Sequence, residues 1–82
     1  MTKLIRNRAT KAFLMTGGKW TLDHQLAQQF QDAAAAYEAA NRFHLTDAEL
    51  YYLIGEAPSN YDISIPIIPS LSPYAAPPGR RH

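Results

Sequence analysis

The glycine pair Gly17-Gly18 constrains the fold of this chain most, because it separates two short apolar runs at residues 12–15 and 20–22. Two consecutive glycines accept positive φ at no steric cost, as the two-residue turns of β-hairpins require. A phosphate-binding loop instead needs several glycines at GxGxxG or GxxxxGK[ST] spacing directly before a helix. A β-type run follows the pair here. We therefore predict a tight two-residue hairpin turn at residues 17–18.

Strand-like segments lie on both sides of this turn. Residues 3–7 and 11–15 have strand composition, and the polar residues 7–10 between them suit a turn. Residues 19–22 would return after the glycines, with Trp20 and Leu22 on one face. Residues 3–22 are thus predicted to form a three-stranded antiparallel meander.

A helical period follows the meander. Apolar side chains recur at steps of three and four residues, and residues 23–44 contain no Gly or Pro and are rich in alanine. The stripe comprises Leu26, Phe30, Ala33, Tyr37, Ala40 and His44. Thr21 or Asp23 can cap the start, whereas Asp32 can cap a second helix. One helix over 23–44 and two helices that break near Asp32 both remain open, and the break is favoured.

Two further strands are expected near the end of the domain. Thr46 and Glu49 have the spacing of a helical capping box, but residues 50–54 are apolar and aromatic on both alternating faces. Five such residues match the length of a strand, so we predict a strand here. Tyr61, Ile63 and Ile65 alternate with polar residues, which predicts an edge strand that the following prolines end.

Length and composition limit the architecture. With 82 residues, of which 46% are hydrophobic and 18% charged, the chain suits one small globular domain. The prediction is a small α+β domain over residues 1–65: an N-terminal antiparallel β-meander, one or two amphipathic helices and one or two further strands. Residues 66–82 are proline-rich and predicted to form an extended or disordered tail. Oligomerisation is a usual remedy for a small core, so a homodimer is one form that the protein could take.

Several kinds of site are excluded or disfavoured. The chain has no cysteine, which excludes disulfides, thiolate zinc sites and cysteine nucleophiles. The histidines are His24, His44 and His82, and their spacing fits no metal motif. The carboxylates Asp47 and Glu49 suit capping and solubility. We predict no catalytic residue, no cofactor and no metal. No apolar stretch is long enough to span a membrane, and a cytoplasmic location is the default expectation.

Charge is distributed in blocks along the sequence. Residues 1–19 carry five basic side chains and no acidic one, whereas residues 20–62 have a net charge of −6. Basic residues interleaved with aromatic ones can hold phosphates and stack bases. The candidate binding residues are Arg6, Arg8, Lys11, Lys19 and Trp20. A meander would divide them into clusters about 17 Å apart, one at each end of the strands, so a solvated basic hairpin is the competing interpretation.

The leading functional hypothesis is a small non-catalytic protein-interaction module of the cytoplasm with an unknown protein partner. Its partner-facing candidates are the basic hairpin and the tail. The alternative is a nucleic-acid-binding domain that uses the same hairpin. A third hypothesis is a hydrolase-like or ligand-binding fold that assembles only as an oligomer.

Overall fold

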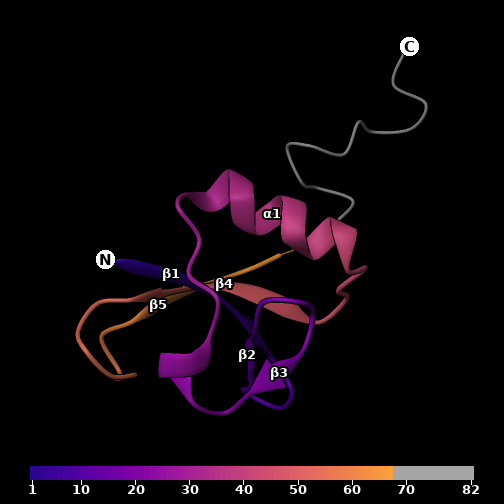
Figure 1. The fold of residues 1–82 in the computed structure, drawn as a ribbon. Helices are drawn as coiled ribbons and strands as arrows, with labels where there is room; N and C mark the ends of the chain where they lie inside the picture. The colour runs from indigo at the N-terminus through magenta and orange to yellow at the C-terminus, as the bar shows by residue number, and fades with distance from the viewer. Residues whose placement is uncertain (68–82) are drawn as a thin grey trace.

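The computed structural model describes residues 1–67 and shows a five-stranded antiparallel sheet with one α-helix on one face (Figure 1). The strand order is β3-β2-β1-β4-β5. The elements are β1 (Thr2–Asn7), β2 (Phe13–Leu14), β3 (Trp20–Thr21), the 3₁₀-helix η1 (His24–Leu26), α1 (Ala33–Arg42), β4 (Ala48–Leu53) and β5 (Ile63–Pro66). The mixed α+β class is as predicted. Most of the predicted tail, residues 68–82, lies outside the described residues.

The predicted meander is confirmed, because β1, β2 and β3 are neighbours in the sheet. The glycine turn is one residue longer than expected. Gly18 N–H donates to the Met15 carbonyl (3.1 Å), and Met15 N–H donates to the Lys19 carbonyl (2.6 Å). Gly17 and Gly18 both have φ of 90°. A Cβ on Gly18 would lie 2.9 Å from the ring of Phe43, so this position requires glycine for space as well as for backbone conformation.

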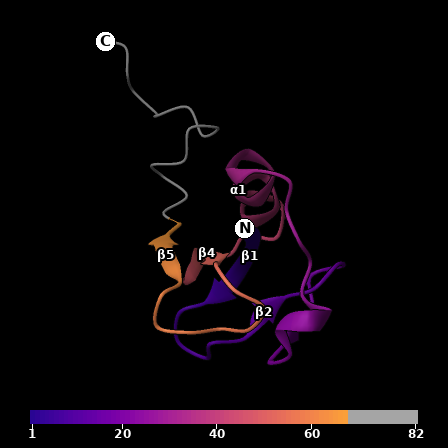
Figure 2. The ribbon, with the colours of Figure 1, turned by 90° about the vertical axis from the view of Figure 1, so that its left-hand side faces the viewer.

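The centre of the sheet is the pairing of β1 with β4, which confirms the strand predicted after Thr46. The register aligns Ile5 with Leu50 and Leu4 with Tyr51. Because side chains alternate along a strand, the first pair lies on the face toward α1, here called the α1 face, and the second on the opposite back face (Figure 2).

The helix predicted from the apolar stripe does not form over the first half of residues 23–44. Only η1 is helical there, and Leu26 is 59% exposed rather than buried. The chain then becomes extended: Gln28 N–H donates to the Leu14 carbonyl and Phe30 N–H to the Lys3 carbonyl, both at 2.9 Å. Gln28 thus bonds to the end of β2, and Phe30 pairs with the part of β1 that the short strand β2 leaves unpaired. Hydrogen bonding to the sheet therefore replaces the hydrogen bonding of a helix.

The predicted break at Asp32 is confirmed. Its side chain accepts a hydrogen bond from Ala35 N–H (2.9 Å), which caps the first turn of α1. The buried residues of α1 are Ala36, Ala39 and Ala40. Methyl side chains let the helix axis approach the sheet closely over β1 and β4.

Two apolar clusters hold the layers together. The cluster on the α1 face combines sheet residues with the helix alanines, and it includes Phe30 and Ile67. The cluster on the back face consists of Leu4, Phe13, Tyr51 and Leu53, with Ala27 packed against it. Pro66 is the last residue of β5 and Ile67 is 3% exposed. The packed domain thus continues two residues past the predicted boundary at 65.

Candidate functional site

Arg6 is part of the internal structure of the back face. Its Nε lies 2.6 Å from Oε2 of Glu49, and its guanidinium lies 4.2 Å from the centre of the Tyr51 ring. The side chains of Arg6 and Glu49 are only 19% and 8% exposed. This arginine is therefore occupied by a carboxylate and an aromatic ring, which limits what it can offer to a phosphate.

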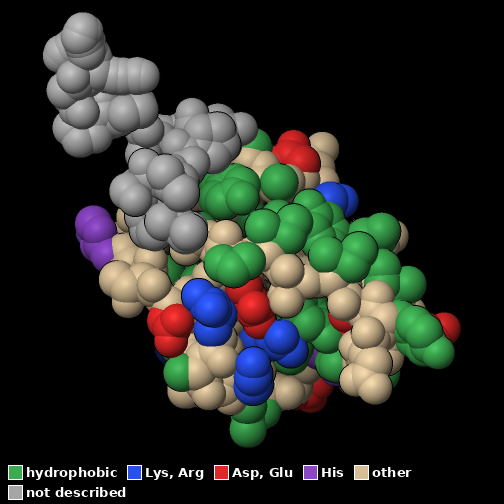
Figure 3. Space-filling model, turned by 180° about the vertical axis from the view of Figure 1, so that it is seen from behind, with side chains coloured by type: hydrophobic (Ala, Val, Ile, Leu, Met, Phe, Trp, Pro, Cys, Tyr) green, Lys and Arg blue, Asp and Glu red, His purple; other side chains and the backbone are tan. Residues whose placement is uncertain are grey.

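The other predicted basic residues lie at the turns. Arg8 and Lys11 are exposed in the turn between β1 and β2, where Lys11 has a φ of 66°. Lys19 is exposed at the glycine turn. Viewed from behind, Lys and Arg side chains gather around acidic ones rather than forming a uniformly positive surface (Figure 3). The exposed Arg8 and Lys11 thus lie at one turn and Lys19 at another, and acidic groups lie among the Lys and Arg side chains on this face.

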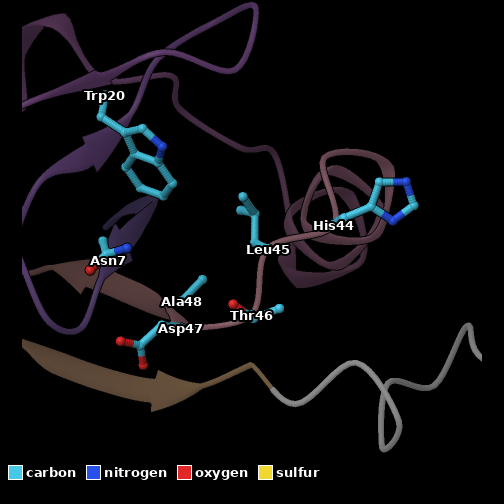
Figure 4. Close-up of a pocket in the computed structure, with 7 residues that line it drawn as sticks. All are labelled: Asn7, Trp20, His44, Leu45, Thr46, Asp47 and Ala48. Carbon is cyan, nitrogen blue, oxygen red and sulfur yellow. The ribbon is translucent and has the colours of Figure 1, made fainter.

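Trp20 lies on the other face of the sheet from Arg6. In the register, Trp20 is opposite Leu14 on the α1 face, whereas Arg6 is opposite Phe13 on the back face. The indole is 37% exposed and points into a hollow of about 220 Å³. Figure 4 shows that His44 points away from Trp20. Trp20 and Arg6 therefore do not share the one binding surface predicted for them.

The groups with shifted pKa values are Tyr51 and Asp62. The Tyr51 hydroxyl donates to Oδ2 of Asp62 at 2.5 Å, and the same carboxylate accepts from the N–H groups of Ile54 and Ser59. Burial, followed by the hydrogen bond to Asp62, raises the pKa of Tyr51 to about 12. Burial opposes ionisation of Asp62, but its three hydrogen bonds and the charge of Arg6 outweigh this and lower its pKa. The pair fastens the loop between β4 and β5 to the back face.

The remaining titratable groups form no metal centre in the described part of the chain. Between residues 1 and 67, no three His, Asp or Glu side chains converge closely enough to hold an ion. Nε2 of His24 is hydrogen-bonded to the Glu56 carbonyl at 2.9 Å, and His44 is exposed. His82 lies outside the described residues.

Strand β5 is an edge of the sheet, as its alternation predicted. Ile67 N–H donates to the Ala48 carbonyl at 2.9 Å, and in the pairing of β5 with β4 Ile65 lies opposite Leu50. Backbone groups of successive strand residues point to opposite sides in the plane of a sheet. The N–H and C=O of Ile65 therefore face β4, whereas those of Ser64 face outward. Pro66 also faces outward, where its missing N–H costs no hydrogen bond within the sheet.

The outer strand also carries uncovered apolar side chains. Ile63 and Ile65 lie on the α1 face and are 51% and 43% exposed, because α1 packs over β1 and β4 and leaves β5 uncovered (Figure 2). Tyr61, just before the strand, is 84% exposed. Sequence reasoning identified the edge strand but not its potential as a site. The available signal was an alternating strand of four residues with no charged side chain.

Comparisons of this chain with protein-family models, with curated proteins and with solved structures find no match. In the part of the chain that the structure describes, no helix combines the length and the apolar character needed to cross a bilayer. Only the residues of this chain then bear on its function.

Proposed function

We propose that this protein is a non-catalytic protein-interaction module that binds an extended segment of a partner along the outer edge of β5. The observation that carries the proposal is the combination of an outward-facing backbone at Ser64 with half-exposed isoleucines on either side. In strand addition, main-chain hydrogen bonds supply affinity and alternate side chains supply specificity.

The composition of β5 supports this role. Sheet edges that must stay unpaired commonly carry charged side chains, a bulge or a covering segment. The sequence of β5 is Ile-Ser-Ile-Pro, which has no charge, and all four residues are exposed, including both isoleucines. Pro66 limits the ladder at one end, since a proline offers an acceptor but no donor. The edge is therefore short, uncharged and capable of pairing at its centre.

The direction of the pKa shifts supports a non-catalytic role. General acids and bases work best with a pKa near the operating pH. In this protein the pKa of Tyr51 is raised to about 12 and that of Asp62 is lowered, so both groups move away from neutrality. Their hydrogen bonds hold a loop in place, which is a structural task.

Nucleic-acid binding is the second candidate, supported by the exposed Arg8, Lys11 and Lys19. It is the weaker one, because Arg6 is paired with Glu49 and Trp20 is on the opposite face. Binding through phosphate contacts would weaken steeply as salt rises. Retention of an oligonucleotide at low salt, with loss on changing Arg8 and Lys11 to glutamate, would favour this candidate.

The proposed function is tested by introducing a charge on the edge strand. Ile65→Lys should weaken capture of a protein partner by about tenfold or more, since a buried ammonium opposes apolar contact. Leu22→Lys is the matched control, because Leu22 is a 77% exposed apolar residue away from β5. The partner is first identified by affinity capture on the full chain and then titrated against the purified variants. Equal affinity of wild type and Ile65→Lys would contradict the proposal.

A further inference from the structure

We infer that the segment bound by β5 is β5 of a second copy of this chain, paired antiparallel about a two-fold axis at Ser64. The inference rests on the proposed function of β5 as a pairing edge and names its partner. Such a dimer would join two sheets into one continuous sheet through identical edges, which is the closed, self-complementary arrangement of a two-fold interface.

The backbone of β5 sets the register of this pairing. Ser64 and Pro66 face outward, and Pro66 has no N–H. Asp62, the next outward position, already donates its N–H within the loop to the Ser59 carbonyl at 3.3 Å. Ser64 is thus the residue of β5 that can both donate and accept. A hydrogen-bonded antiparallel pair exchanges two bonds between the same two residues, so Ser64 fits opposite Ser64 of the second copy.

This register also brings the apolar side chains together. With Ser64 opposite its own copy, Ile63 lies opposite Ile65 of the second copy, and the reverse pair forms on the other side of the axis. Both pairs lie on the α1 face, where these side chains are half exposed in the single chain. They would occupy non-hydrogen-bonded positions, at which cross-strand side chains approach most closely. One pairing therefore satisfies the backbone and covers the isoleucines.

The charges permit two identical strands to meet. No charged side chain lies within Ile63–Pro66. Asp62, the nearest carboxylate, would lie opposite Pro66 of the second copy, so the two Asp62 groups are at opposite ends of the contact. Each is also held by the Tyr51 hydroxyl on its own chain. Identical edges therefore meet without like-charge repulsion at the centre.

The chain's own residues 68–82 suit this edge less well. Prolines occupy positions 69, 73, 77 and 78. Each of them removes a backbone donor, so residues 69–78 offer runs of no more than three consecutive donors. A second copy of β5 supplies both a donor and an acceptor at the position where β5 requires them.

A proline at the two-fold position tests the pairing directly. Ser64→Pro deletes the outward N–H and leaves the β4–β5 ladder its hydrogen bonds, because those come from Ile63, Ile65 and Ile67. Sedimentation velocity of the full chain, from about 10 μM to about 1 mM, should show a concentration-dependent dimer whose dissociation constant rises about tenfold or more in Ser64→Pro. Ser64→Thr is the control, since threonine keeps the N–H and favours strands, and its dimer should match the wild type.

A cysteine at the same position gives an independent test that does not depend on how Ser64→Pro folds. The chain has no cysteine of its own. The two Ser64 Cα atoms would be about 5.5 Å apart, which lies within the range that a disulfide spans. Ser64→Cys should therefore form a disulfide-linked dimer on mild oxidation, whereas Leu22→Cys, at an exposed position away from the axis, should remain monomeric under the same conditions.

The outcomes separate this inference from the proposed function. A monomer throughout the concentration range, or a dimer that Ser64→Pro leaves unchanged, overturns the self-pairing. If that monomer still loses a protein partner through Ile65→Lys, the proposed function stands and only the second copy is wrong. Slow hydrogen exchange of the Ser64 amide in a monomer would show that the chain covers its own edge, and this result would overturn both.

Discussion

The ion pair between Arg6 and Glu49 gives a sharp test of how the back face is held together. Arg6→Met keeps most of the aliphatic stem but removes the charge, leaving the carboxylate of Glu49, 8% exposed, without its partner at 2.6 Å. Breaking a buried ion pair costs about 3–5 kcal/mol. Because Arg6 is 19% exposed and water reaches it, we expect a cost below that range, about 2–3 kcal/mol. A domain of this size has a total free energy of unfolding of about 4–12 kcal/mol.

The measurement is urea unfolding followed by fluorescence of Trp20, the single tryptophan. Arg8→Met serves as the control, since Arg8 is exposed and its replacement should change stability by less than about 0.5 kcal/mol. Adding Glu49→Met to Arg6→Met removes the unpaired charge, so the double variant should recover to within about 1 kcal/mol of the wild type. A double variant as unstable as Arg6→Met alone would refute the argument that an unpaired buried carboxylate is the cause.

Three smaller changes test other parts of the fold. Gly18→Ala should destabilise the fold by about 1–3 kcal/mol and by more than Gly17→Ala, because only the Cβ at position 18 meets an aromatic ring. Equal melting temperatures of the two variants would contradict this. Asp32→Ala should cost about 1 kcal/mol through loss of the helix cap, measured by urea unfolding. The raised pKa of Tyr51 contributes stability that is fully present at pH values below its ordinary pKa of 10, and this contribution is lost as the pH rises toward about 12. The lowered pKa of Asp62 contributes stability that is present at pH values above its ordinary pKa of 3.8, and this contribution is lost as the pH falls through the pKa of the folded state. Melting temperature against pH should show both losses, and Tyr51→Phe should reduce the alkaline one.

Local signals in the sequence predicted the local parts of the structure. The glycine pair marked the hairpin, Asp32 marked the start of α1, and the alternation of Ile63 and Ile65 marked the edge strand. Each depends on the conformational preference of one or a few neighbouring residues. The same kind of reasoning could therefore define the elements but not their lengths, and β2 has two residues where five were expected.

Contacts between distant segments explain what could not be predicted. The helical stripe through Leu26 and Phe30 was interrupted because backbone groups of residues 28–30 bond to the sheet, which no local pattern records. Arg6 and Glu49 are 43 residues apart, and only the register of β1 with β4 makes them partners. The sequence thus presents Arg6 as a free cation, whereas the structure pairs it with Glu49 and leaves the isoleucines of β5 exposed.

The central position of β1 has a consequence for how the chain acquires its structure. Its main partner, β4, begins at Ala48, so β1 can complete this pairing only after the residues up to β4 have been synthesised. Closing a loop of this length carries an entropic cost of about 3 kcal/mol beyond its constant part, whereas the hairpin and α1 can form from neighbouring residues. On the ribosome, β1 therefore emerges with the edge that β4 later pairs still open, and its core residues Leu4 and Ile5 stay uncovered until the sheet closes.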